Sequence, residues 1–256
     1  MANPNKKLAG EKGLYLYGVS RAAAKKGKAA IMKPGSPGID GVSAVKAIAC
    51  GDFICWVSGV DNASFAQDME RNIENLEWLA LHSVRHQQVV GEVAAQVAIV
   101  PARFGTIFSG EAALVKNVLG RSEALKKVFD RVADADEWGV KVFAEKKTAA
   151  KVTSAQSGRE YLQQKAAQIK QPPERNDPEL KEFATALEKV ASDTAPSGKV
   201  SGTQPSLLWQ STFLVPRSRR KQWEKVLSEF VERWDGQRRI EVNGPWPPYS
   251  FVADAE

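Results

Sequence analysis

The stretch SRRKQWEKVLSEFVERWDG, Ser218 to Gly236, carries the clearest structural pattern in this sequence. Its large apolar side chains recur every three or four residues, which places them on one side of an α-helix. We predict that Ser218 caps this helix and that Gly236 ends it. The apolar stripe, which another element has to cover, consists of Trp223, Val226, Leu227, Phe230, Val231 and Trp234.

Strand patterns surround this helix. The segment LLWQSTFLV (Leu207 to Val215) precedes it, RRIEV follows it, and EWGVKVF (Glu137 to Phe143) alternates apolar and polar residues as a half-buried strand does. A second helix is predicted after Asp177, an N-cap residue followed by Pro178 at the first helical position. The order β-α-β-α-β predicts two helices on one face of a small antiparallel sheet, a modified ferredoxin-like layer.

Two further segments of the second half have weaker patterns. The capping box SGRE at Ser157 predicts a helix ahead of Asp177, so that the two helices form a kinked arm or a helical hairpin. Residues 192–206, SDTAPSGKVSGTQPS, contain few large apolar side chains and many Ser, Gly, Thr and Pro residues. Such a composition favours a mobile loop.

The first half begins with strand patterns. GLYLYGVS, residues 13–20, predicts one strand, and residues 42–60 predict two strands that turn at Gly51 and Asp52. Residues 97–108, VAIVPARFGTIF, also look extended. Because Pro101 lacks a backbone N–H and restricts the residue before it, we expect an edge, a bulge or a bent connection there.

Two helices are predicted to follow in the first half. One begins at the capping box SFAQ at Ser64 and runs, with a break, to about Gln96, and the other runs from about residue 110 to residue 133. Together the patterns indicate an α+β protein of two domains. The N-terminal domain is predicted at residues 1–134, and the C-terminal domain at residues 135–256, with the loop 192–206 and a tail at 243–256.

Composition and charge place the chain among globular proteins. Of its 256 residues, 43% are hydrophobic and 26% are charged. No apolar run approaches the roughly 20 residues that span a bilayer, and the N-terminus lacks the apolar stretch of a secretory signal, so we expect a cytoplasmic protein. The net charge of +6 allows an anionic partner, but a solvated basic surface is the commoner explanation.

Residue types that carry chemistry are few. Cys50 and Cys55 are expected to be reduced and buried. His82 and His86 share a helical face, and we expect one inside and one towards water, because a zinc site needs about four ligands. No nucleophile elbow, kinase or dinucleotide-binding motif occurs. We therefore expect no enzyme activity and no catalytic, cofactor or metal site.

Nucleic-acid binding is the weakest of the functions that the sequence suggests. The segment RFGTIF, residues 103–108, has aromatic residues but lacks the residue order of an RNA-recognition strand. Basic residues gather in KKGK, residues 25–28, and in PRSRRKQ, residues 216–222. If these residues hold phosphates, the affinity for RNA falls steeply with added salt.

Several segments occur in a characteristic order, namely LYLYGV, LHSVRHQQVV, VPARFGTIF, EWGVKVF, GREYL and NGPWPPYSFV. In this series the sequence resembles the GvpL/GvpF family of gas vesicle proteins, from about Leu14 to Val252. The resemblance implies two α+β domains, the second a modified ferredoxin-like fold with a C-terminal tail. It also implies a part in building gas vesicles, the gas-filled, protein-walled organelles that give microbial cells buoyancy, with no established enzymatic activity.

The resemblance further implies partners and a location. The family is associated with contacts to the small hydrophobic gas vesicle wall protein, as minor structural components or as assembly factors. We therefore expect a cytoplasmic protein associated with gas vesicles. An assembly hub that binds only accessory vesicle proteins is the alternative. The elaboration KKGKAAIMKPGSPG and the loop at residues 192–206 depart from the family pattern.

The tail NGPWPPYSF, Asn243 to Phe251, is either a ligand for another protein or a latch on its own molecule. Its prolines cannot sit in a central strand. Docking its aromatic side chains within the molecule avoids the association cost of a separate partner, which favours a latch across the interface between the halves. The tail residues expected to matter are Trp246, Pro247, Pro248, Tyr249 and Phe251.

Arg103, Phe104 and Gly105 form the second group of candidate residues. The arginine can pair or cap, the phenylalanine can pack, and the glycine lets two backbones approach. We expect these residues to fix the junction between the halves, or only to hold the fold.

Overall fold

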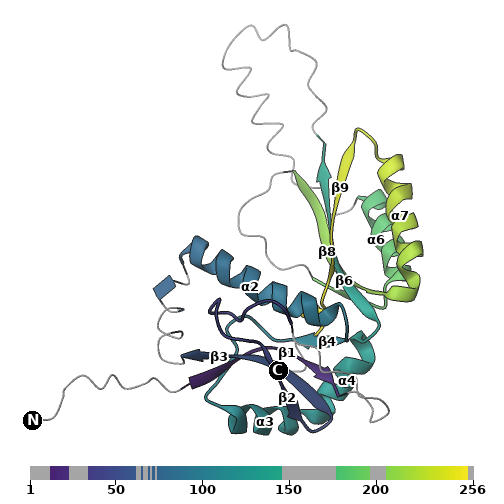
Figure 1. Cartoon of the computed structure of the whole chain (residues 1–256). Helices are drawn as coiled ribbons and strands as arrows, with labels where there is room; N and C mark the ends of the chain where they lie inside the picture. Colours follow the sequence, from purple (N-terminus) through teal and green to yellow (C-terminus); the bar gives the residue numbers. More distant parts are fainter. Residues whose placement is uncertain are drawn as a thin grey trace, which may run out of the picture. The chain divides into compact units, whose positions relative to one another are not determined.

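The computed structural model describes residues 12–22, 34–61, 65, 69, 71–72, 74–145, 177–196 and 206–252. The chain divides into two compact units, Met1–Ala133 with Pro247–Glu256, and Asp134–Trp246. Each unit combines helices with an antiparallel sheet, so the protein is α+β, as predicted (Figure 1). The sequence prediction placed residues 243–256 in the C-terminal domain. The tail from Pro247 belongs instead to the first unit, in which Phe251 and Val252 are buried.

The first unit is built around its central strand. The strands are β1 (Lys12–Arg21), β2 (Lys46–Cys50), β3 (Phe53–Asp61), β4 (Ile99–Pro101) and β5 (Ile107–Phe108). The sheet order is β2-β3-β1-β4, and β5 also pairs with β1. β1 is antiparallel to β3, β4 and β5. Every described strand of this unit except β2 therefore pairs directly with β1.

Two predictions about these strands are confirmed. β2 and β3 form the expected hairpin, in which Cys50 faces Phe53 and Gly51 adopts a φ of +64°. Pro101 lies in β4, at the end of the strand order. An edge strand tolerates proline because its N–H is not needed on the open side.

Helices cover both faces of this sheet. α2 (Leu76–Ala94) lies on one face, and α3 (Glu111–Gly120) and α4 (Ser122–Val132) lie on the other (Figure 1). Because side chains alternate along a strand, β1 directs Tyr15 and Tyr17 into the core beneath α2, and Leu16 towards α3 and α4. The central strand is thus buried on both sides.

The helix boundaries differ in part from the prediction. The predicted break before α2 is confirmed, and Asn75 caps this helix by accepting the N–H groups of Glu77 and Trp78, whereas Ser64 lies outside the described residues. The single helix predicted at residues 110–133 is wrong. It is interrupted at Arg121, whose φ and ψ of −111° and 14° leave the helical region. Gly120 precedes the break and has a low helix propensity.

The second unit has four strands and two helices among its described residues. They are β6 (Ala135–Ala144), α6 (Pro178–Val190), β7 (Asp193–Ala195), β8 (Leu207–Pro216), α7 (Arg220–Arg233) and β9 (Arg238–Trp246). The sheet order is β7-β8-β6-β9, with every neighbouring pair antiparallel. Both helices pack on one face of this sheet (Figure 1).

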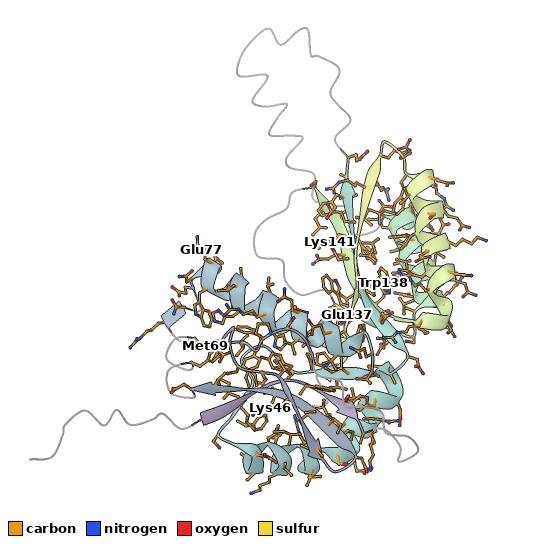
Figure 2. All side chains as sticks on the ribbon, in the orientation of Figure 1. Lys46, Met69, Glu77, Glu137, Trp138 and Lys141 are labelled. Atoms are coloured by element: carbon orange, nitrogen blue, oxygen red, sulfur yellow. The ribbon has the colours of Figure 1, made fainter. Side chains whose placement is uncertain are left out.

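Side chains from the sheet and from both helices form the core of the second unit. Trp138 on β6 packs near Trp223 of α7, and Phe183 of α6 packs against Phe230 and Trp234 of α7. Figure 2 shows Trp138 and Lys141 on the same strand, at positions that alternate to opposite faces of the sheet. The alternation predicted for this strand is confirmed, since Trp138, Val140 and Val142 all belong to the core.

Several features of the second unit were predicted correctly. Asp177 caps α6 by accepting the N–H groups of Glu179 and Leu180, with Pro178 in the first turn. The strand predicted at Leu207–Val215 is β8. Most of the α7 stripe is buried or packed against the core, but Val231 is 51% exposed.

Two predictions for this unit were wrong. β7 occupies residues 193–195 of the predicted loop, and it pairs through its backbone with residues 212–214 of β8. Its sequence, Asp-Thr-Ala, has no large apolar side chain that would indicate a strand. Ser218 does not cap α7, because a 3₁₀ turn at Arg217–Arg219 precedes the helix and places Arg219 at the cap. The remaining loop residues 197–205 and the helix predicted at Ser157 lie outside the described residues.

We predict that Gly244→Ala destabilises the second unit. Gly244 has a φ of +144°, and an added Cβ would lie 2.8 Å from the carbonyl oxygen of Glu137 and 2.9 Å from the ring of Trp138. Strain of this kind costs about 1–3 kcal/mol, which urea unfolding followed by tryptophan fluorescence measures. The control is Gly139→Ala, whose Cβ would meet its nearest neighbour at an ordinary 3.9 Å. Equal stabilities of the two variants would contradict the prediction.

Candidate functional site

The described residues hold no group of three or more His, Cys, Asp or Glu side chains that could bind a metal ion. Cys50 and Cys55 are both buried as free thiols, as expected, with their sulfur atoms 3.0 Å apart. Burial raises the pKa of the Cys55 thiol well above its ordinary value. Because the thiolate is the reactive form, this environment makes Cys55 a poor nucleophile.

A buried polar cluster lies beneath α2 in the first unit. The Tyr15 hydroxyl lies 2.9 Å from Nδ1 of His86 and accepts the N–H of Gly105 at 3.1 Å. The Tyr17 hydroxyl lies 2.8 Å from Oγ of Ser58. These bonds satisfy polar groups that would be costly to bury alone.

Burial keeps the groups of this cluster neutral at ordinary pH. It lowers the pKa of His86 to about 4 and raises the pKa of Tyr17 to about 12. It also raises the pKa of Tyr15, despite the hydrogen bond from Gly105. His86 is the histidine expected inside, whereas His82 is half-buried and stacks on Trp78 with ring centroids 4.0 Å apart.

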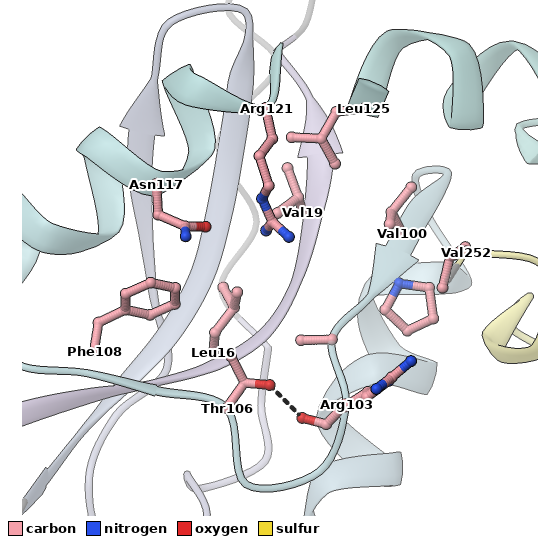
Figure 3. A pocket seen from close by; sticks show the side chains of 12 residues that line it. Leu16, Val19, Val100, Arg103, Thr106, Phe108, Asn117, Arg121, Leu125 and Val252 are labelled. Carbon is pink, nitrogen blue, oxygen red and sulfur yellow. Dashed lines mark hydrogen bonds between the residues drawn. The ribbon is translucent and has the colours of Figure 1, made fainter. Parts of the chain in front are cut away.

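The candidate residues Arg103, Phe104 and Gly105 form the turn between β4 and β5. Phe104 packs edge-on against Tyr15 and His86, with ring centroids 6.4 Å and 6.1 Å apart. Gly105 has a φ of +84°, which favours glycine, and an added Cβ would lie 2.9 Å from Sδ of Met69. The Arg103 side chain is exposed, and its carbonyl accepts the Thr106 hydroxyl at 2.8 Å (Figure 3). These contacts tie the turn to the cluster.

The tail docks on the first unit through part of its predicted residues. The Tyr249 ring lies 6.3 Å from the His86 ring, and its hydroxyl donates to Oε1 of Gln87 at 3.3 Å. Arg131 donates to the carbonyl of Phe251, whose side chain is only 4% exposed. Pro248 is also buried, but Trp246, which is the last residue of β9, is 49% exposed. The aromatic residues of the tail therefore differ in their environments.

The outward side of α2 carries apolar side chains that the sequence analysis missed. Leu76, Leu81 and Val84 are 78%, 50% and 53% exposed. Leu81 and Val84 point away from the buried side of the helix, which holds His86, Val89, Val90 and Val93, and Leu76 lies beside them at the first helical position. We call Leu76, Leu81 and Val84 the outer face of α2. The sequence did contain a signal for this face. Leu81 and Val84 fall outside the periodicity of the buried residues, so the helix carries apolar side chains on a second side.

A family model described as "Gas vesicle synthesis protein GvpL/GvpF" matches residues 13–253 of this chain. The chain belongs to the GvpL/GvpF family. The predicted resemblance is thereby confirmed over both units. Membership of this family supports a role in gas vesicle formation.

Curated relatives of the GvpL/GvpF family carry either of its two names. "Gas vesicle protein L" of Streptomyces sp. (strain CB03234) is 26% identical, over 94% of this chain and 93% of the relative. "Gas vesicle protein F" of Haloferax mediterranei is 23% identical, over 84% of this chain and 85% of the relative. The similarity thus extends over most of the length of each protein.

Solved structures of the family share the fold. The crystal structure of GvpF from Anabaena sp. PCC7120 superposes with a TM-score of 0.63 at 20% identity, covering 94% of this chain and 96% of that protein. The crystal structure of GvpF from Microcystis aeruginosa also superposes with a TM-score of 0.63, at 17% identity. It covers 94% of this chain and 98% of that protein. Among the described residues, no helix combines the length and apolarity needed to cross a membrane.

We predict that the first unit becomes less stable as the pH is lowered from about 6.5 to about 4. The unfolded chain protonates His86 near its ordinary pKa of 6.5, but the folded chain does so only near 4, so acid favours the unfolded state. The shift corresponds to about 3 kcal/mol in total, which urea unfolding at pH 7.5 and pH 4.5 measures. His86→Gln should remove most of this dependence and His82→Gln should keep it. An unchanged pH dependence in His86→Gln would contradict the prediction.

We predict that two substitutions in the tail lower the stability by different amounts. Phe251→Ala removes a buried ring from the first unit and should lower its stability by about 3 kcal/mol. Trp246→Ala removes a ring that is 49% exposed and should cost less than about 1 kcal/mol. Thermal unfolding of both variants is the measurement. If Phe251→Ala leaves the melting temperature unchanged, the tail is not a latch.

Proposed function

We propose that this chain supports gas vesicle formation by binding the hydrophobic gas vesicle wall protein, as an assembly factor or a minor structural component. Family membership supplies the vesicle context. The observation that carries the proposal is the outer face of α2, where three large apolar side chains meet solvent on one side of one helix. Exposed apolar groups of this kind mark interaction sites when they gather on one surface.

The size of the outer face suits a weak and reversible contact. Full burial of a Leu or Val side chain contributes about 1.5–3 kcal/mol, and these three side chains are already partly covered. Their gain of a few kcal/mol lies at the lower end of the roughly 4–15 kcal/mol that association costs. An assembly factor has to release the wall protein, so a weak contact fits the proposed role, and firm capture requires a further contact.

An assembly hub that binds only accessory vesicle proteins is the second candidate function. It is favoured by β9, which lies at the end of the strand order in the second unit. β9 exposes Val242 by 37% and Trp246 by 49%, and it also carries the charged residues Arg238, Arg239 and Glu241. Such an edge can add a strand from a partner, and its mixed polarity suits an accessory protein better than an apolar wall.

Nucleic acid is a weaker partner than protein because the basic run at residues 216–222 is engaged within the second unit. Arg217 pairs with Asp136 at 3.1 Å, and Arg220 pairs with Glu224 at 3.0 Å. Guanidinium groups in such pairs are less available to phosphates. The other basic run, at residues 25–28, lies outside the described residues.

We also propose a fold for the second unit, and a chemical role and a location for the chain. We assign the second unit a ferredoxin-like fold, because the order β6-α6-β7-β8-α7-β9 and the sheet order β7-β8-β6-β9 correspond to the split β-α-β arrangement. We assign the chain no catalytic role, and we place it in the cytoplasm with the vesicles. The turn at Arg103–Gly105 is given a structural role, supported by its contacts with Tyr15 and His86.

We predict that charge on the outer face of α2 abolishes wall-protein binding. In the double variant Leu81→Glu/Val84→Glu, each carboxylate would have to lose its water against an apolar partner, so the affinity should fall at least about tenfold. Binding is measured by pairwise capture of the tagged full chain with the wall protein and with each accessory vesicle protein. The matched control is Leu119→Glu/Val231→Glu, because these residues are 50% and 51% exposed on other helices.

The outcomes separate the two candidate functions. Loss of wall-protein capture in the α2 variant but not in the control supports the wall-binding function. Capture of accessory proteins alone by the wild-type chain overturns it in favour of the hub. Equal capture of the wall protein by both variants means that the outer face of α2 is not the binding surface.

A further inference from the structure

A pocket in the first unit lies between the sheet and the helices α3 and α4. Its volume is about 240 Å³. Leu16 and Val19 of β1, together with Val100 and Leu125, make its walls apolar (Figure 3). The polar groups around it come from Arg103, Thr106, Asn117 and Arg121. The pocket thus combines an apolar lining with two guanidinium groups, and no carboxylate is among its lining residues.

Arg121 brings a positive charge into this pocket without a counter-charge. Its Nε atom is buried and has no hydrogen-bond partner, and no ion pair joins its side chain to any residue that the structure describes. Burial raises the pKa of the nearby Cys55 thiol, and the positive charge of Arg121 offsets part of that effect. The charge of Arg121 therefore acts on a residue of strand β3. The Arg121 side chain is only partly buried, but a buried N–H donor without a partner is costly. This unsatisfied donor gives the free protein a position for an anion.

The position of Arg121 in the chain explains why its side chain enters the pocket. The residue sits at the break between α3 and α4, where the backbone leaves the helical region. Asn117 lies four residues earlier, in α3, and its side chain and that of Arg121 both line the pocket (Figure 3).

The chemistry of the lining selects the class of ligand. A guanidinium group binds a carboxylate through two parallel N–H donors, and Asn117 can add an amide N–H at the rim. The apolar walls favour an aliphatic group beside the charge, which an inorganic anion lacks. A volume of about 240 Å³ is below the range of roughly 300–1,000 Å³ for drug-sized ligands. It suits one or two amino-acid side chains.

We propose that this pocket binds an acidic side chain and a neighbouring aliphatic side chain from a segment of a partner vesicle protein. The proposal rests on the proposed function, because it supplies the further contact that the outer face of α2 requires. The two surfaces lie on opposite faces of the same sheet and would engage different segments. Two weak contacts of this kind raise the overall affinity without making either one permanent.

The pocket can be tested without any vesicle protein. The probes are the blocked dipeptide acetyl-Leu-Glu-amide, its acetyl-Leu-Gln-amide counterpart and sodium sulfate, each titrated into the full chain. The readout is the ¹H-¹⁵N resonance of the Arg121 Nε–H group. We expect a saturable shift with the Glu dipeptide and binding at least about tenfold weaker with the Gln dipeptide, because the hydrogen bonds lose their charge assistance.

Variants separate a binding role from a structural one. Arg121→Met should abolish the response, monitored through neighbouring backbone amides, and should not lower the melting temperature, because it removes a buried N–H donor that has no partner. Asn117→Asp changes an exposed residue, and its carboxylate should compete with the ligand and weaken binding. The control Lys116→Gln removes one positive charge from the exposed side of α3 and should leave the affinity unchanged.

The outcomes are distinct from those of the α2 experiment. No shift with the Glu dipeptide, or equal binding of the Glu and Gln dipeptides, overturns the proposal even if the wall protein binds normally. A sulfate shift as strong as that of the Glu dipeptide also overturns it, in favour of a site for inorganic anions. A selective response to the Glu dipeptide supports it, even if the outer face of α2 proves not to bind the wall protein.

Discussion

The first unit depends on one constraint, which is that β1 is buried on both faces. Its backbone pairs with three strands, so its N–H and C=O groups are satisfied within the sheet. Its side chains must then be covered on both sides, by α2 over Tyr15 and Tyr17 and by α3 and α4 over Leu16. The layered arrangement of the unit follows from this requirement.

The polar atoms on β1 impose a second requirement. Because the Tyr15 and Tyr17 hydroxyls lie in the core, partners must reach them there, and His86, Gly105 and Ser58 do so from other elements. The tail closes the same region with Tyr249 beside His86. Residues near both ends of the sequence thus contribute to one core, which explains why the tail is grouped with the first unit.

The surfaces assigned to binding follow from the same packing. A helix needs one apolar side to cover β1, and the apolar side chains on the opposite side of α2 do nothing for the core. At the break between α3 and α4, Arg121 likewise contributes a charged side chain to the lining of a largely apolar pocket. Such departures from local rules are expected at functional positions.

Features that depend on neighbouring residues could be predicted from the sequence. The stripe of α7, the alternation of β6, the Asp177 cap, the turn at Gly51 and the edge position of Pro101 all follow from periodicity or from the local chemistry of one residue. The family was also evident from the order of short segments, and the family match over residues 13–253 confirms it.

The remaining features could not be predicted in this way, because they depend on contacts between residues that are distant in the sequence. β7 is a strand through backbone bonds to β8, which leave no trace in its own side chains. The burial of Phe251 and the exposure of Trp246 depend on what each ring meets, although both belong to one short motif. The pocket at Arg121 joins residues from β1, β4, α3 and α4. Local sequence indicates the shape of elements with a clear periodicity or cap, but burial and the pairing of distant segments are properties of the folded chain.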